Sequence, residues 1–132
     1  MRQSSILAVA FAAAASASPY VPNPCFVTTY AGIAAAVANC TDITLKDIHA
    51  PTNGSIDLTN VRANSRVTFA GCTTFDYSPY DAFNPIVLAG KNVTITGARG
   101  HVIDGSGGLY WDGLGSNGGL AKSVSSYTLK LE

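Results

Sequence analysis

A repeated pattern, apolar-x-apolar-x-Gly, most constrains what this chain can fold into. It occurs at residues 67–71, 86–90 and 93–97, and equivalent residues of the first and third copies lie 26 positions apart. Short strands that end at glycine turns and recur with a period in the twenties are typical of a parallel β-helix, in which each coil stacks on the next. The sequence therefore predicts an all-β solenoid.

The expected strands are short and are separated by Gly, Asn, Asp and Pro, the residues that favour turns. They lie at residues 43–45, 56–58, 67–70, 86–89, 93–96, 102–104 and 127–131. A β-sandwich would have longer strands. At roughly 23 residues per coil, residues 25–132 are expected to form about five coils.

One amphipathic helix is predicted at residues 30–39, with the hydroxyl of Thr28 or Thr29 as its N-terminal cap. Its apolar face consists of Ile33, Ala36, Val37 and Cys40. Because the end of a solenoid exposes apolar surface and unpaired backbone, we expect this helix to cover the first coil.

The first residues have the features of a secretory signal peptide: Arg2, an apolar run at residues 6–15, and the small residues 15–17. Cleavage is expected after Ala17, which leaves 18–24 as a short leading segment and 25–132 as the β-helix domain. A membrane span needs about 20 apolar residues, and no later stretch approaches that length. We expect a secreted protein with no membrane partner.

Composition and charge exclude an intrinsically disordered protein and a nucleic-acid-binding protein. The chain has 8 basic and 8 acidic side chains, 12% charged residues and 47% apolar residues. Intrinsic disorder needs low hydrophobicity and high net charge, and nucleic-acid binding needs clustered Lys and Arg, which are scattered here. Neither class fits.

Secretion makes the three cysteines candidates for disulfide bonds before metal ligands. Cys25 and Cys40 bracket the helix and are expected to pair. Cys72 is then an unpaired thiol. It indicates a reactive cysteine, a dimer, or a partner cysteine in a missing piece of the chain, and we favour the missing piece. His49 and His101 lack neighbours at ligand spacing, so we expect no metal and no cofactor.

Three sites match the Asn-x-Ser/Thr pattern of N-glycosylation, at Asn39, Asn53 and Asn92. Asn92 is the strongest candidate, and Asn39 the weakest because its middle residue is the cysteine expected to be bridged. The glycines that crowd residues 90–119 lack a following Gly-Lys-Ser/Thr, so we assign them to coil corners rather than to a phosphate-binding loop.

An ordered series of blocks resembles the amino-terminal part of fungal endo-polygalacturonases of glycoside hydrolase family 28, over residues 25 to about 122. The blocks are Cys25 to Cys40 around the helix, 67–69 with Gly71 and 73–75, 84–87 (Asn-Pro-Ile-Val), 92–97 (Asn-Val-Thr-Ile-Thr-Gly), 100–105 (Gly-His-Val-Ile-Asp-Gly) and 110–113 (Tyr-Trp-Asp-Gly). The resemblance implies a right-handed, pectin-lyase-like parallel β-helix that hydrolyses α-1,4-galacturonosyl bonds of pectin with inversion.

Inversion needs two carboxyl groups, which the family supplies from Asn-Thr-Asp and Asp-Asp blocks, supported by Gly-His-Gly and Arg-Ile-Lys. None of these blocks occurs in the printed sequence, so no catalytic residue is assigned. We interpret His101 as a turn residue. Asp104 and Asp112 could form a carboxylate pair, but they flank a glycine turn, and a turn role is the expected one.

Aromatic side chains could offer a platform for a sugar ring, although packing under loops is the expected role. They are Tyr77, Tyr80, Phe83, Tyr110 and Trp111. Two departures from the family are Cys72, where a small polar residue is usual, and residues 123–127, which replace a Pro-Lys-Phe-Phe-like stretch.

These features favour an amino-terminal fragment of a secreted endo-polygalacturonase, monomeric and inactive alone, with pectin or polygalacturonate as the implied ligand. The alternatives are a decoy β-helix that binds pectin or titrates an inhibitor, and a structural or adhesive β-helix.

Overall fold

Short strands are the main regular elements of the computed structural model, which describes residues 21–114 and residue 119. Its two 3-10 helices are η1 and η2, and its α-helix is α1. The elements are β1 (Phe26–Val27), η1 (Tyr30–Gly32), α1 (Ile33–Asn39), β2 (Asp42–Lys46), β3 (His49–Ala50), β4 (Ile56–Leu58), β5 (Arg66–Ala70), β6 (Cys72–Phe75), β7 (Ile86–Leu88), β8 (Thr94–Gly97), β9 (Val102–Asp104) and η2 (Gly107–Tyr110).

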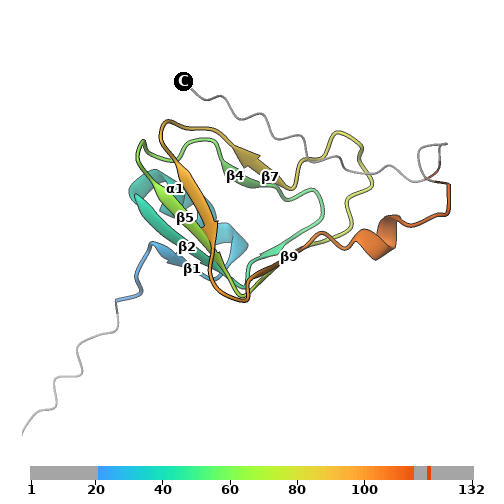
Figure 1. The fold of residues 1–132 in the computed structure, drawn as a ribbon, viewed down its shortest axis with the longest axis horizontal. Coiled ribbons are helices and arrows are strands. Elements are labelled where there is room, and N and C mark those ends of the chain that lie inside the picture. Colours follow the sequence, from blue (N-terminus) through green and yellow to red (C-terminus); the bar gives the residue numbers. More distant parts are fainter. Residues whose placement is uncertain (1–20, 115–118, 120–132) are drawn as a thin grey trace, which may run out of the picture.

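The strands form three sheets, and every pairing in them is parallel (Figure 1). The sheets have the orders β1-β2-β5-β8, β3-β6-β9 and β4-β7. The chain therefore visits the three sheets in turn, completes two coils as β2-β3-β4 and β5-β6-β7, and begins another with β8 and β9. This arrangement is consistent with the predicted parallel β-helix. The expected count of about five coils includes residues outside the described ranges.

The coils are longer than the expected 23 residues, and their length varies. Asp42 pairs with Arg66, 24 residues further along, whereas Val67 pairs with Ile95, 28 residues further along. The 26-residue spacing that matched Val67 to Val93 was therefore wrong by two residues. The added length lies between β6 and β7, where the connection at residues 76–85 is longer than the one between β3 and β4.

The core runs through the stack as ladders of inward side chains. Along β2 and β5, Ile43 lies against Val67 and Leu45 against Phe69, and all four are buried. Their neighbours along each strand are more exposed, as the two-residue period of a strand requires. On β8 the ladder reaches Ile95, which is 38% exposed.

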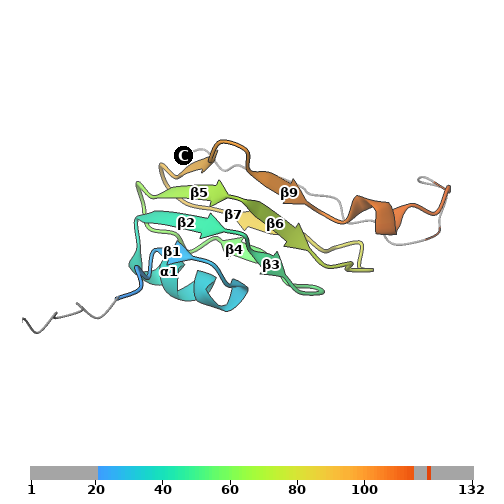
Figure 2. The ribbon, with the colours of Figure 1, turned by 90° about the horizontal axis from the view of Figure 1, so that it is seen from below.

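The helix lies at the β1 end of the stack, away from β8 and β9 (Figure 2). Its buried residues are Ile33, Ala36 and Val37, and Cys40 follows, as the sequence predicts. The predicted threonine cap was wrong: Thr29 makes no side-chain capping bond, because the segment opens with a 3-10 turn in which the Gly32 N–H donates to the Thr29 carbonyl, 3.1 Å away.

Six expected strands are present with bounds that differ by at most one residue at either end. The strands β1, β3 and β6 were not predicted, and the expected strand at 127–131 lies outside the described residues, as does the leader at 1–17. Within the described part of the chain, no helix is both long and apolar enough to cross a membrane.

Candidate functional site

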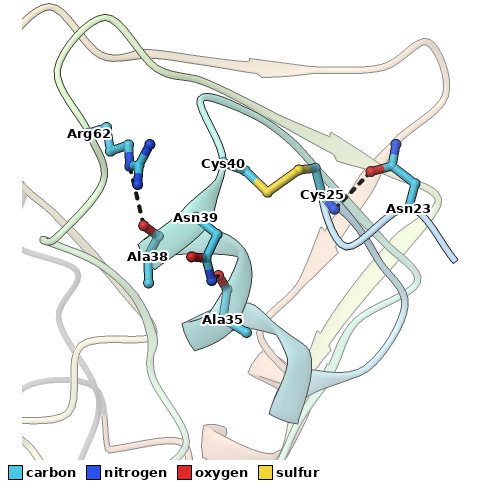
Figure 3. Close-up of a disulfide and its surroundings, with 7 residues drawn as sticks. All are labelled: Asn23, Cys25, Ala35, Ala38, Asn39, Cys40 and Arg62. Atoms are coloured by element: carbon cyan, nitrogen blue, oxygen red, sulfur yellow. Dashed lines mark hydrogen bonds between the residues drawn. A yellow bond between two sulfur atoms is a disulfide. The ribbon is translucent and has the colours of Figure 1, made fainter. Parts of the chain in front are cut away.

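A disulfide fixes the helix to the segment before β1. Cys25 and Cys40 are bonded, with Cα atoms 5.7 Å apart (Figure 3), which confirms the predicted pair. The Asn23 side chain accepts a bond from the Cys25 N–H at 3.0 Å, and Arg62 Nε donates to the Ala38 carbonyl at 3.2 Å. The helix end is therefore held both by a covalent bond and by the coil that follows it.

An open depression of about 440 Å³ lies beside this disulfide. Its lining comes from the segment before β1, the end of α1 and the start of β2: Asn23, Cys25, Phe26, Asn39, Cys40, Thr41, Asp42 and Thr44. Asp42 is its one charged residue. The lining thus has one carboxyl group, whereas inverting glycoside hydrolysis uses two.

Cys72 is a free, exposed thiol, and the structure describes all three cysteines. Its own backbone N–H donates to Asp47 Oδ1 at 2.9 Å. Asp47 adopts a left-handed conformation (φ 51°). It directly follows β2, one coil below Gly71, because the preceding residues Lys46 and Ala70 are register partners. The carboxylate thus joins two successive coil corners, which is a structural role.

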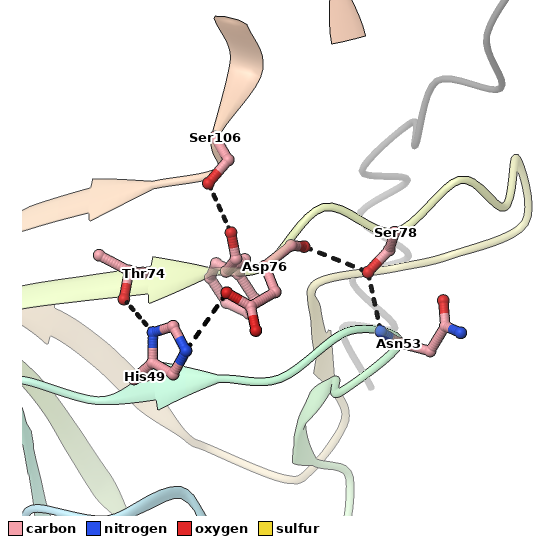
Figure 4. A network of polar contacts seen from close by, with 7 residues as sticks. His49, Asn53, Thr74, Asp76, Ser78 and Ser106 are labelled. Atoms are coloured by element: carbon pink, nitrogen blue, oxygen red, sulfur yellow. Dashed lines mark hydrogen bonds and ion pairs between the residues drawn. The ribbon is translucent and has the colours of Figure 1, made fainter. Parts of the chain in front are cut away.

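A polar cluster occupies the outer face of the β3-β6-β9 sheet (Figure 4). His49 Nδ1 lies 2.9 Å from Thr74 Oγ1, and His49 Nε2 lies 3.2 Å from Asp76 Oδ1. His49 and Thr74 are register partners on β3 and β6. The cluster was missed from the sequence because neither strand was predicted; the signal was the 25-residue spacing of the two residues.

The cluster is a surface network with no metal site. The side chains of His49 and Asp76 are 65% and 43% exposed, and they form an ion pair only when His49 is protonated. Exposed pairs of this kind contribute little to stability. No group of three or more His, Cys, Asp or Glu side chains in the described ranges could hold a metal ion. Asp76 is the one carboxyl group of this cluster.

A second network joins the long connection at 76–85 to its neighbours. The Asn53 N–H donates to Ser78 Oγ at 2.8 Å, and Ser78 Oγ donates to the Asp76 carbonyl at 3.2 Å (Figure 4). Ser106 Oγ donates to the Phe75 carbonyl at 2.6 Å. Asn53 of the preceding coil therefore holds the connection itself, and Ser106 of the following coil holds the end of β6 directly before it.

The aromatic candidates divide into two groups. Tyr77 packs against Tyr110 with ring centroids 4.8 Å apart, and Phe83 is buried, as the packing role predicts. Tyr80 and Trp111 are 58% and 83% exposed, so packing was the wrong expectation for these two. The structure thus joins Tyr77 to Tyr110 and leaves Tyr80 and Trp111 on the surface.

The aspartates and the histidine near the glycine-rich stretch have turn roles, as predicted. Asp104 Oδ1 accepts the Ser106 N–H at 2.8 Å, and Asp112 Oδ1 accepts the Leu114 N–H at 2.9 Å. His101 lies in the turn after β8, with its backbone N–H and Nδ1 each 3.0 Å from the Ala98 carbonyl.

The three glycosylation candidates all have exposed asparagine side chains. Asn39 ends α1, Asn53 lies in the turn between β3 and β4, and Asn92 lies in the turn before β8. Their glycosylation stays a prediction.

The family model for glycosyl hydrolases family 28 matches residues 40–130. Residues of this chain are 57% identical over 98 residues to Probable endopolygalacturonase D of Neosartorya fischeri, covering 74% of this chain and 21% of the relative. They are 49% identical over 120 residues to Probable endopolygalacturonase D of Emericella nidulans, covering 86% and 23%.

A third relative, Polygalacturonase of Fusarium fujikuroi, is 53% identical over 95 residues, which cover 72% of this chain and 26% of the relative. In all three comparisons the matched residues span about a fifth to a quarter of the relative's length.

Proposed function

The chain belongs to glycosyl hydrolases family 28, and we propose that it forms the amino-terminal coils of a secreted endopolygalacturonase. The observation that carries the proposal is the family match over residues 40–130, together with about 50% identity to fungal proteins named as polygalacturonases. The substrate would be polygalacturonate, cleaved at α-1,4-galacturonosyl bonds with inversion at the sugar. The parallel sheets support the proposal, with β8 and β9 as the strands on which further coils of a right-handed β-helix would stack and α1 as the cap at the other end.

In this proposal the residues of the given sequence support the β-helix and do not catalyse hydrolysis. Inverting hydrolysis needs two carboxyl groups roughly 6.5–9.5 Å apart, one to protonate the leaving oxygen and one to activate water. Asp47, Asp57 and Asp104 each accept bonds from backbone N–H groups at turns, and the printed sequence contains neither Asn-Thr-Asp nor Asp-Asp. Hydrolysis would therefore depend on coils that carry those blocks.

A reducing-end assay on polygalacturonate tests the scaffold role. The purified 132-residue chain should release no more reducing ends than a blank, and Asp104→Asn should give the same background. Hydrolysis by the chain that disappears in a purified Asp76→Asn or Asp104→Asn variant would show that its own carboxyl groups catalyse the reaction.

The transcript downstream of the codon for Glu132 tests the larger proposal. Finding Asn-Thr-Asp, Asp-Asp, Gly-His-Gly and Arg-Ile-Lys blocks in any reading frame would support an endopolygalacturonase gene. Their absence in all frames would contradict it and favour a β-helix with a binding role.

A further inference from the structure

We propose that Asn92 is the principal N-glycosylation site of this chain. The inference rests on the secretion proposed above, since the modification takes place in the secretory pathway. In the transfer, a bond forms between Asn92 Nδ2 and C1 of an oligosaccharide carried on a lipid diphosphate. The bond from C1 to the diphosphate oxygen breaks, the amide loses one proton, and the lipid diphosphate leaves.

The turn before β8 presents Asn92 to solvent. Asn92 is exposed in a left-handed conformation (φ 53°), and Asn64, one coil below, is also exposed and left-handed (φ 64°). Asn92 Nδ2 donates to Asn64 Oδ1 at 2.7 Å. An amide nitrogen has two hydrogens: one makes this bond and the other is the one that the sugar replaces, so the glycan and the bond between coils are compatible.

Thr94, the third residue of this sequence pattern, is also exposed to solvent. Thr94 is exposed at the start of β8, and its hydroxyl makes no hydrogen bond to another described residue. Its backbone N–H donates to the Ser65 carbonyl at 2.9 Å, so the strand is fixed while the side chain stays free. The pattern requires that hydroxyl, and here it remains available after the coil has folded.

In the competing pattern at Asn53, the required hydroxyl is engaged in a hydrogen bond within the folded coil. Gly54 is buried, and Ser55 Oγ donates to the Asn84 carbonyl at 2.6 Å. The Ser55 carbonyl also accepts the Tyr30 hydroxyl at 2.8 Å. Once this coil folds, the required hydroxyl is engaged, which lowers the expected occupancy at Asn53.

The pattern at Asn39 is constrained by the helix and by the disulfide. Asn39 is the last residue of α1, and its Nδ2 donates to the Ala35 carbonyl at 2.8 Å (Figure 3), a bond that leaves one amide hydrogen, as at Asn92. The next residue, Cys40, is buried and bonded to Cys25. This asparagine lies in a helix whose end is covalently fixed, and not in an open turn.

The test is glycan mapping on the full chain, secreted from yeast behind a heterologous leader so that the result does not depend on residues 1–17. Peptide N-glycosidase treatment in heavy-oxygen water marks each glycosylated asparagine for mass spectrometry. We expect the highest occupancy at Asn92, loss of that mark in Asn92→Gln and Thr94→Ala, and its retention in Thr94→Ser. Asn53→Gln and Asn39→Gln are the matched controls and should leave it unchanged.

Occupancy at Asn53 or Asn39 that equals or exceeds that at Asn92, or secreted chain without any glycan, would overturn the assignment. Failure of the native leader alone would instead count against the proposed secretion, and a separate experiment with residues 1–17 in place measures it.

Discussion

The Tyr110 hydroxyl accepts a hydrogen bond from the buried Ser78 N–H at 2.8 Å, although the two residues belong to successive coils. The same side chain lies against the ring of Tyr77. These contacts join η2 to the long connection at 76–85 and hold that connection against the coil that follows. The connection is thus part of the folded stack and not a separate loop.

Tyr110→Phe is expected to keep the ring contact with Tyr77 and to leave the Ser78 N–H without its partner. An unpaired buried donor costs about 1–3 kcal/mol, so the free energy of unfolding should fall by about 1 kcal/mol or more and the Ser78 amide should exchange faster. Urea unfolding and hydrogen exchange measure both. Tyr80→Phe is the control because Tyr80 is exposed, and equal effects of the two variants would contradict the assigned role.

Replacing Cys25 and Cys40 by serine should destabilise the chain by about 3 kcal/mol, the loop-closure estimate for a disulfide that closes about 15 residues. The measurement is urea unfolding of the variant and the parent. Cys72→Ser is the matched control: it removes the free thiol and should leave the unfolding midpoint unchanged. A parent chain that reacts with more than one equivalent of thiol reagent before reduction would contradict the pairing.

The sequence predicts the β-helix because the alternating pattern apolar-x-apolar-x-Gly recurs at residues 67–71, 86–90 and 93–97. The same alternation cannot set the register between coils. A shift of two residues keeps every side chain on its own face, and the pattern-based match of Val67 to Val93 therefore satisfied the burial rule as well as the observed pair with Ile95 does. The turn around Asn92 and the length of the connection at 76–85 determine that Val67 pairs with Ile95 and not with Val93.

The polar cluster of His49, Thr74 and Asp76 escaped prediction for a related reason. β3 has two residues and β6 has the sequence Cys-Thr-Thr-Phe, so neither shows enough apolar alternation to be read as a strand. Without those strands, the 25-residue spacing of His49 and Thr74 is close to one coil but does not place the two residues in facing positions. The disulfide and the Asp104 turn were predictable because both depend on residues close together in the sequence.

Gly71→Ala should be destabilising because Gly71 has a positive φ of 63° and a Cβ there would overlap the Asp47 carboxylate. The left-handed conformation costs a residue with a side chain about 1–2 kcal/mol, and displacing Asp47 also removes its bond to the Cys72 N–H. Gly105→Ala is the control, since a Cβ at Gly105 meets nothing within 4 Å. Thermal unfolding should separate the two variants, and a Gly71→Ala protein as stable as Gly105→Ala would be inconsistent with this geometry.

Thr73→Val is expected to stabilise the chain. Thr73 is buried on β6, and its hydroxyl has no hydrogen-bond partner among the described residues. An unpaired buried hydroxyl costs about 1–3 kcal/mol, and valine fills nearly the same volume without it, so the free energy of unfolding should rise by about 1 kcal/mol. Thr74→Val is the matched control one position along the strand: it removes the oxygen that contacts His49 Nδ1 on the outer face and should bring no gain. Urea unfolding measures both variants. Equal or lower stability of Thr73→Val would contradict the assignment of this hydroxyl as unpaired.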